Sequence, residues 1–232
     1  NLNMRLRERR SAVVGVRKFD ERQVFAQALE VFWRKGFPST TMQDLAQATG
    51  VQRGSLYNAY GDKEEVFVRV FDAYAARFLD EARGALNAPD AKQALQCFFG
   101  VIIANMTSGF PPRGCLTTKT AADGSIHSPR IHGRVRQLLI DLEDVLRAAM
   151  SREPIRTGLT LEPSEAARVV VTFTRGLAVM ERIYQDPKWL NQSAAAMVRI
   201  LLSGKRSGAR ADPVASPVAS PVASVVFSEP PD

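Results

Sequence analysis

The stretch that decides the fold is TMQDLAQATGVQRGSLYNAYGDK, residues 41–63. Its pattern predicts two short helices joined by a tight turn, a shape that can place the second helix in the major groove of DNA. Ala46 is small where the two helices would cross, and Gly50 can adopt the positive φ that the turn needs. Leu56 is placed to fill the core beneath the second helix. The stretch therefore predicts a helix-turn-helix motif.

The residues before and within this stretch predict where the first helices begin. Asp20, with Gln23 three residues later, predicts the start of a helix that ends at Gly36. Thr41 and Asp44 predict an N-terminal cap for the next helix, because a hydroxyl and a carboxylate at this spacing can bond to each other's backbone N–H groups. Three helices then make up a small N-terminal domain.

In this region the chain resembles the TetR-type transcriptional repressors. The likeness covers roughly residues 18–70 and rests on Thr41, Leu45, Ala46, Gly50, Val51, Ser55, Leu56, Tyr57, Tyr60, Lys63 and Val66. It departs from the family at Gln43, where the family often has Arg, and at Ala59, where it often has a bulky side chain.

The resemblance implies an all-α fold, with an N-terminal three-helix helix-turn-helix domain joined to a helical ligand-binding and dimerisation domain. It also implies a transcriptional regulator, and a repressor rather than an enzyme. Such a protein binds a palindromic operator in double-stranded DNA as a homodimer, and a small-molecule inducer of unknown identity releases it.

The second helix of the motif carries the side chains that we expect to read DNA. Arg53 can pair with guanine and Asn58 with adenine, each pair contributing about 1–3 kcal/mol of discrimination. Gly54 would let the backbone approach the groove wall. Phosphates are expected to be held by Thr41, Tyr57 and Lys63. The full set of predicted DNA-binding residues is Thr41, Gln43, Gln52, Arg53, Gly54, Ser55, Tyr57, Asn58 and Lys63.

Composition and pattern divide the chain into four segments. We expect a flexible basic arm at residues 1–17, the helix-turn-helix domain at 18–66, the ligand-binding and dimerisation domain at 67–205, and a tail at 206–232. The arm either follows the DNA backbone or is a solvated terminus. The tail repeats PVAS three times and is expected to be disordered, because it cannot bury a core.

Apolar residues at helical spacing continue through the second domain, and no useful run alternates as a strand would. Asp62 is expected to cap a long helix that reaches about Gly84 and connects the two domains. The family resemblance implies that this helix swings when DNA is released. Further helices are predicted at about residues 91–107, 113–122, 131–151, 164–185 and 188–203.

The overall composition favours a basic protein of the cytoplasm. The 232 residues carry a formal net charge of +7, with a pI near 9.8, which favours a polyanionic partner. No apolar run approaches the roughly 20 residues that span a bilayer, so no membrane association is expected. Two cysteines make no disulfide framework, which suits a reducing compartment.

The last two predicted helices carry broad apolar faces that suit an oligomer interface. These faces are Ala166, Val169, Val170, Phe173, Leu177 and Met180, and Ala194, Ala195, Met197, Val198, Leu201 and Leu202. The alternative is that both faces cover the core of their own subunit. The family resemblance favours the homodimer.

An inducer cavity is expected among the helices of residues 91–185, where apolar bulk gathers. The candidate ligand-binding residues are Phe98, Phe99, Met106, Phe110, Cys115, Phe173, Arg175, Met180 and Tyr184. The competing interpretation is that aromatic residues at helical spacing simply form the core.

Cys115 offers a second route to regulation. It follows Gly114 near the predicted start of a helix, with Lys119 nearby, and positive charge at such a place lowers the pKa of a thiol. It is either a redox- or electrophile-sensing group or an inert core residue, and a thiol-dependent enzyme is a remote alternative. His127 and His132 do not share a helix face, so neither a metal site nor a cofactor is predicted.

Overall fold

The computed structural model describes residues 20–202, and within that range it contains helices and no strand. The helices are α1 (Glu21–Lys35), α2 (Met42–Thr49), α3 (Arg53–Tyr60), α4 (Lys63–Ala85), α5 (Ala91–Thr107), α6 (Leu116–Ala122), the 3-10 helix η1 (Ser125–His127), α7 (Pro129–Met150), α8 (Ile155–Gly158), α9 (Pro163–Tyr184) and α10 (Pro187–Leu202). The predicted all-α fold is confirmed for this part of the chain. The expectations for the basic arm and the PVAS tail lie outside the described residues.

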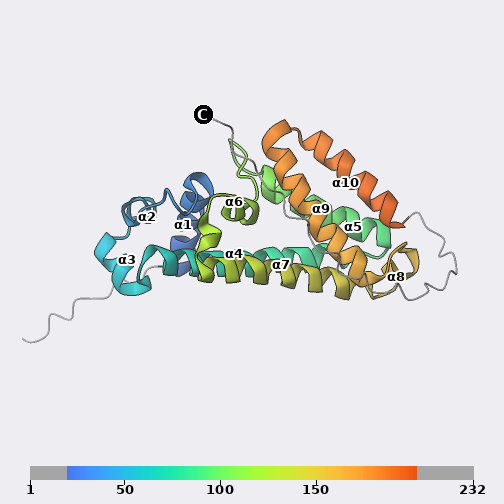
Figure 1. The fold of residues 1–232 in the computed structure, drawn as a ribbon, viewed down its shortest axis with the longest axis horizontal. Coiled ribbons are helices and arrows are strands. Elements are labelled where there is room, and N and C mark those ends of the chain that lie inside the picture. The colour runs from blue at the N-terminus through green and yellow to red at the C-terminus, as the bar shows by residue number, and fades with distance from the viewer. Residues whose placement is uncertain (1–19, 203–232) are drawn as a thin grey trace, which may run out of the picture.

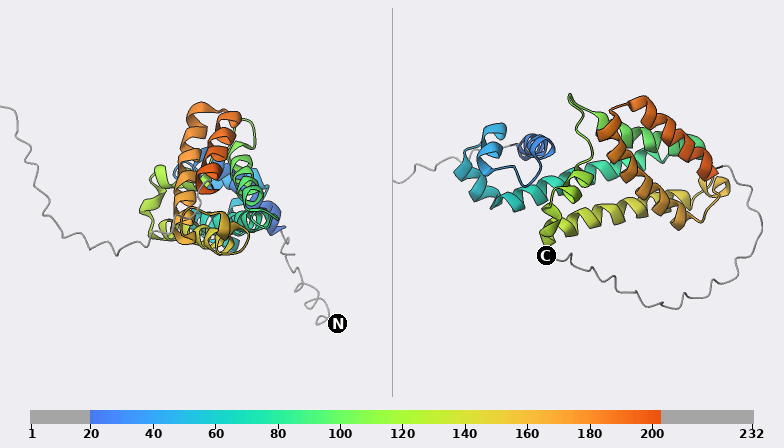
Figure 2. Two further views of the ribbon diagram at one scale, coloured as in Figure 1. Left: turned by 90° about the vertical axis from the view of Figure 1, so that its right-hand side faces the viewer. Right: turned by 45° about the horizontal axis from the view of Figure 1, so that its top comes forward.

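The helices form an elongated molecule with the helix-turn-helix at one end (Figure 1). α2 and α3 lie at that end, while α4 and α7 run side by side along the long axis. The turned views show α5, α9 and α10 layered over the α4–α7 pair (Figure 2). Across residues 20–202, none of the helices has the length and apolar character that crossing a bilayer requires.

Most helix boundaries lie close to the predicted ones, and the differences have local causes. α6 begins at Leu116 instead of residue 113, because Gly114 has a φ of 70° and Cys115 is the extended N-cap residue. α7 begins at Pro129, where the sequence predicted a break. A proline is tolerated at the first position of a helix, because the N–H it lacks would have no helical partner there. The short helices η1 and α8 were not predicted. They lie in the gaps between the helices predicted at about residues 113–122, 131–151 and 164–185.

Side-chain caps start the first two helices as predicted. The Asp20 carboxylate accepts from the N–H groups of Arg22 and Gln23. At α2 the capping box is complete, since the Asp44 N–H donates to Thr41 Oγ1 over 3.1 Å and the Thr41 N–H donates to Asp44 Oδ2 over 2.9 Å. These bonds satisfy N–H groups that a helix start otherwise leaves unpaired.

A cluster of aromatic rings joins the helix-turn-helix domain to the long helix α4. Phe67 meets Phe32 edge to face at 5.0 Å and Phe37 at 5.2 Å between ring centroids. It also stacks against Phe71 at 5.7 Å. Phe32, Phe67 and Phe71 are completely buried. The position of α1 is therefore fixed against the first two turns of α4.

The second domain also contacts α1 directly, close to its C-terminal end. Lys119 Nζ on α6 donates to the backbone carbonyls of Trp33 and Arg34 over 2.6 and 3.1 Å. In the loop before α6, Arg113 forms an ion pair of 2.9 Å with Glu30. The loop and α6 therefore contact α1 directly, independently of α4.

Candidate functional site

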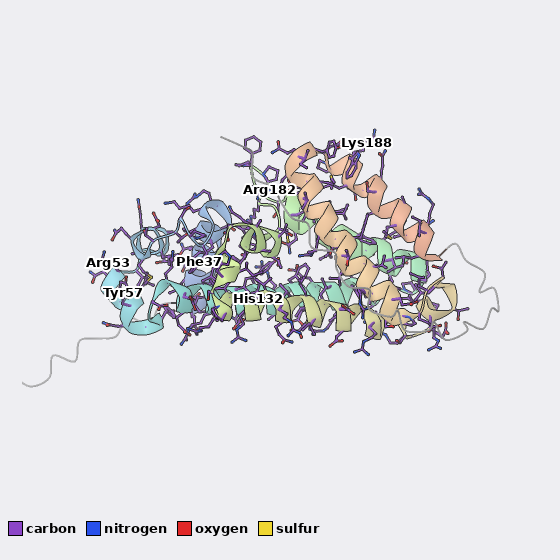
Figure 3. The ribbon with its side chains drawn as sticks, in the orientation of Figure 1. Phe37, Arg53, Tyr57, His132, Arg182 and Lys188 are labelled. Carbon is purple, nitrogen blue, oxygen red and sulfur yellow. The ribbon has the colours of Figure 1, made fainter. Side chains whose placement is uncertain are left out.

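α3 presents a polar surface at the free end of the molecule, where Figure 3 labels Arg53 and Tyr57. Leu56 and Tyr60 are buried beneath it, as predicted for the apolar side of the helix. The Tyr57 side chain is 46 % exposed. The remaining predicted positions on this surface are exposed, except for the half-buried Ser55, and comprise Gln52, Arg53, Gly54, Ser55 and Asn58.

The start of α2 adds Thr41 and Gln43, which are both exposed. The Thr41 hydroxyl already has two partners inside the capping box, because it donates to Asp44 Oδ2 over 2.8 Å and accepts from the Asp44 N–H. Lys35, whose Nζ lies 2.6 Å from Asp44, and Thr41 together lower the pKa of Asp44 to about 2. The Asp44 carboxylate therefore stays ionised at neutral pH. The phosphate contact of the Thr41 hydroxyl stays a prediction, and a phosphate would have to compete with Asp44 for that hydroxyl.

Lys63 takes a position that the sequence did not reveal. Its ammonium donates to the carbonyls of Phe37 and Pro38 over 2.9 and 3.3 Å, and it lies 4.3 Å from the centroid of the Phe37 ring. Burial lowers the pKa of Lys63. The phosphate contact predicted for Lys63 stays a prediction, and its side chain would have to leave these carbonyls to make it.

A small internal cavity lies among α4, α5, α6, α7 and α9, and three of the predicted ligand-binding residues line it: Met106, Cys115 and Arg175. The remaining space is about 10 Å³, room for about one water-sized sphere. A drug-sized ligand needs a pocket of about 300 Å³ or more. Side chains must therefore move apart before a small organic molecule can enter.

The other predicted ligand-binding residues lie outside this cavity. Phe110 is fully exposed in the loop between α5 and α6, and Tyr184 is exposed at the end of α9, where it stacks on Trp189 with centroids 4.9 Å apart. Neither residue lines the internal cavity, because both lie where the chain faces solvent, and a role for either in ligand binding stays a prediction. Phe98 and Phe99 are fully buried core, while Phe173 and Met180 are half-buried and pack against that core.

Two helices that the sequence did not mark as cavity lining, α4 and α7, also form the wall of the internal cavity. Tyr74 and Phe78 come from α4, and Leu138, Leu139 and Leu142 come from α7. Their spacing of three or four residues was visible in the sequence. The same spacing is equally typical of a helix that only connects two domains, so it does not mark these residues as cavity lining.

Cys115 lies beside a cation in the wall of the cavity. Arg175 Nη1 is 3.3 Å from Cys115 Sγ. Burial alone would raise the pKa of the thiol, but the Arg175 guanidinium and hydrogen bonds from Thr118 and Thr117 outweigh it, so the pKa of Cys115 lies below its ordinary value. The second cysteine, Cys97, is exposed, and no cysteine in the described residues is in a disulfide.

The predicted apolar faces of α9 and α10 mostly cover the core of their own subunit. Their buried members are Ala166, Val170, Leu177, Ala194, Val198 and Leu201. A second row on α9, which shares Val169 with the predicted face, is exposed, and we call it the outer row: Val169, Thr172, Gly176, Val179 and Ile183. Its members are spaced alternately three and four residues apart, so they share one side of the helix. A Cβ added to Gly176 would meet no atom within 4 Å.

Comparison with known proteins agrees with this architecture. Residues 24–70 match the sequence model described as "Bacterial regulatory proteins, tetR family". The HTH-type transcriptional repressor ComR of Escherichia coli (strain K12) is 33 % identical over 99 residues, which are 42 % of this chain and 47 % of ComR. The matched stretch thus spans about half the length of that relative.

Solved structures extend the likeness over the described fold. A cysteine mutant of the TetR family transcriptional regulator CifR, complexed with 26-bp double-strand operator DNA, is 25 % identical, with a TM-score of 0.70 over 79 % of this chain and 97 % of CifR. The reduced form of NemR from E. coli has a TM-score of 0.70 at 18 % identity, over 78 % of this chain and 95 % of NemR. From the helix-turn-helix match and the shared fold, the chain belongs to the TetR family of bacterial transcriptional regulators.

Proposed function

We propose that this protein is a cytoplasmic repressor that binds a palindromic operator in double-stranded DNA as a homodimer, and that a small molecule releases it. The observation that carries the proposal is the exposed polar surface of α3, held at the end of the molecule by the buried Leu56 and Tyr60. A surface of this shape suits the major groove. The CifR structure, which holds operator DNA, supports the proposal by its fold.

Arg53→Ala tests the proposed reading of DNA. The variant is expected to lose about 5- to 150-fold in affinity for the operator, because a bidentate contact to guanine contributes about 1–3 kcal/mol. Its affinity for unrelated DNA should fall much less. The ratio of operator affinity to affinity for unrelated DNA should therefore be lower than in the wild type. Titration of labelled duplexes measures both.

Arg136→Ala is the matched control, because Arg136 is exposed on α7, away from α3. It should bind operator and unrelated DNA as the wild type does. Equal operator affinity of Arg53→Ala and the wild type would remove Arg53 from the reading surface.

Substitution of Gly54 distinguishes the contribution of this residue to the stability of α3 from its contribution to DNA binding. A Cβ at Gly54 would meet no atom within 4 Å, so Gly54→Ala should stabilise the fold by about 0.5–1 kcal/mol through helix propensity. The same methyl group would meet the groove wall, and operator affinity should fall. Gly84→Ala in α4 is the control, since its Cβ also meets open space.

The expected outcome is that both alanine variants unfold at higher denaturant concentration and only Gly54→Ala binds the operator more weakly. Unchanged operator affinity of Gly54→Ala would contradict a close approach of the α3 backbone to DNA.

The proposed dimer uses the outer row of α9. Val179 is 44 % exposed and Ile183 is 65 % exposed, which is unfavourable for aliphatic side chains in water. Gly176 lies at the centre of the row, where a mid-helix glycine costs stability and lets a second helix approach closely. A two-fold axis along this row would present two copies of α3 to one operator.

A second candidate for release is modification of Cys115. The specific observation in favour is the guanidinium of Arg175 at 3.3 Å from Sγ, which stabilises the thiolate form that reacts with oxidants and electrophiles. Lys119, four residues later, bonds to the carbonyls of Trp33 and Arg34 on α1. A group attached to Sγ would push on α6 and change the position of α1.

Selective alkylation tests this candidate. In a Cys97→Ser variant, complete modification of Cys115 by N-ethylmaleimide is expected to lower operator affinity by about tenfold or more, within the range of allosteric coupling. In Cys115→Ser, alkylation of Cys97 should leave affinity unchanged. Mass spectrometry reports the extent of modification, and full operator affinity after complete modification of Cys115 would dismiss the thiol sensor.

A further inference from the structure

An open cavity of about 420 Å³ lies at the junction of the two domains, separate from the internal cavity. We call it the junction cavity. It is formed by the end of α1, the loop at residues 109–114, α6 and the last turn of α9. The side chains that decide its chemistry are Glu30, Trp33, Arg34, Lys119, Glu181 and Arg182. Figure 3 labels Arg182 near the end of α9 that lies closest to α6.

Positive charge dominates the walls of the junction cavity. Arg113 is paired with Glu30, and Lys119 is bonded to backbone carbonyls. The guanidinium groups of Arg34 and Arg182, in contrast, form no hydrogen bond or ion pair with any residue in the range 20–202. They come from different domains, since Arg34 is on α1 and Arg182 is on α9. Two unpaired cations on facing elements attract an anion.

A buried acid, Glu181, lies in the same walls, with Arg182 as its neighbouring charge. Glu181 is 3 % exposed, and its carboxylate has no hydrogen bond or ion pair within the described part of the chain. Its Oε2 lies 3.6 Å from the position that a Cβ on Gly114 would take, and Gly114 itself lines the cavity. Burial raises the pKa of Glu181, and the nearby Arg182 guanidinium offsets this rise only in part. The carboxylate oxygens accept no hydrogen bond from the described residues, so a hydroxyl group of a ligand in the cavity could donate to them.

The cavity also offers an aromatic wall. Trp33 is buried, and its indole Nε1 has no acceptor among residues 20–202. The Arg113 guanidinium lies 5.0 Å from the centroid of the Trp33 ring. At the rim, Phe110 is fully exposed beside Pro111 and Pro112. These surfaces suit a flat ring, whereas the indole N–H is enclosed by the protein and makes no contact in the proposed site.

We propose that the junction cavity binds a small aromatic acid that carries a hydroxyl group. Its carboxylate pairs with Arg34 and Arg182, its ring lies against Trp33 and Phe110, and its hydroxyl donates to Glu181. The volume of about 420 Å³ lies in the range of small-molecule sites, whereas the internal cavity beside Cys115 offers about 10 Å³. Gly114 lines both cavities, so the new site lies next to Cys115 without including it.

A ligand in this position would hold the two domains together, because it bonds to α1 and α9 at once. The coupling is reciprocal, so any change in operator affinity on ligand binding equals the change in ligand affinity on operator binding. The binding step itself does not depend on recognition of DNA. Binding of the aromatic acid is therefore measured without DNA. If the proposed repressor function proved wrong, the measured binding to the junction cavity would still stand.

Calorimetric titration of the full chain with 3- and 4-hydroxybenzoate tests the site. At least one of the two is expected to bind. Benzoate should bind about tenfold more weakly, because it has no hydroxyl group that could donate a hydrogen bond to Glu181. 4-Hydroxybenzyl alcohol, which lacks the carboxylate, should not bind measurably. The absence of binding by both hydroxybenzoates up to about 1 mM would overturn the proposal.

Substitutions locate the binding. Arg182→Met should lower the affinity for the hydroxybenzoate about tenfold or more, and Arg182→Lys, which keeps the charge, should lower it less. Arg168→Met, at the other end of α9 and outside the cavity, is the matched control. Glu181→Leu should abolish the advantage of hydroxybenzoate over benzoate. Wild-type affinity in Arg182→Met would show that the acid binds elsewhere and would overturn the assignment.

Discussion

Ile183→Asp is expected to turn the protein into a monomer and to lower its operator affinity by about 100-fold or more, because a single reading head loses the effective concentration that the dimer provides. Ile183 is the most exposed aliphatic residue of the outer row, at 65 %. In a symmetric interface each aspartate would be desolvated and would face an equivalent charge of the partner copy. Sedimentation equilibrium measures the assembly, and titration with operator measures the affinity.

Ile140→Asp is the matched control for this change. Ile140 is an exposed isoleucine on α7, outside the outer row, with 37 % of its surface exposed. It should remain dimeric and keep the wild-type affinity. A dimeric Ile183→Asp with unchanged operator affinity would contradict the proposed interface.

Phe67→Ala is expected to destabilise the protein by about 3–5 kcal/mol, the cost typical of a buried phenylalanine. Phe67 contacts Phe32, Phe37 and Phe71 with ring centroids 5.0, 5.2 and 5.7 Å away, so its removal leaves a cavity between α1 and α4. Operator binding should fail even at temperatures where the second domain is folded. Denaturant unfolding followed by circular dichroism measures the loss.

Phe110→Ala makes the same change of side chain at a fully exposed position. It should alter the free energy of unfolding by no more than about 0.5 kcal/mol. A Phe67→Ala variant as stable as Phe110→Ala would show that the aromatic cluster does not hold the two domains together.

The sequence predicted the helix-turn-helix closely because local chemistry determines it. Thr41 and Asp44 cap α2 through bonds within three residues, and Gly50 adopts a φ of 66° in the turn. Leu56 faces the core because the period of the helix places it there. These features depend on near neighbours in the chain, so a single sequence reveals them.

The contacts between distant segments could not be predicted in this way. The ammonium of Lys63 binds carbonyls 25 and 26 residues away, and that of Lys119 binds carbonyls 85 and 86 residues away. Neither partner carries a sequence signal, because any residue has a backbone carbonyl. The apolar face of α9 left two interpretations open for a related reason: periodicity identifies an apolar side but does not say whether it covers the subunit's own core or a partner's surface.

The candidate sites show the same division. Met106, Cys115 and Arg175 were expected in one cavity and line it together. The junction cavity was not foreseen, because Arg34 and Arg182 are separated by most of the chain and meet only through the packing of α6 and α9 beside α1. Phe110 was predicted from its aromatic character to line an inducer cavity among the helices of residues 91–185, and it lies at the rim of the junction cavity.

Selection of binding sites from a pool of random duplex DNA, with the full chain as the bait, tests the central claim most directly. We expect enrichment of one sequence pattern made of two inverted half-sites, with centres about one helical turn of DNA apart or a multiple of it. Enrichment of no sequence, or of a single half-site without its inverted copy, would contradict a two-fold operator read by α3.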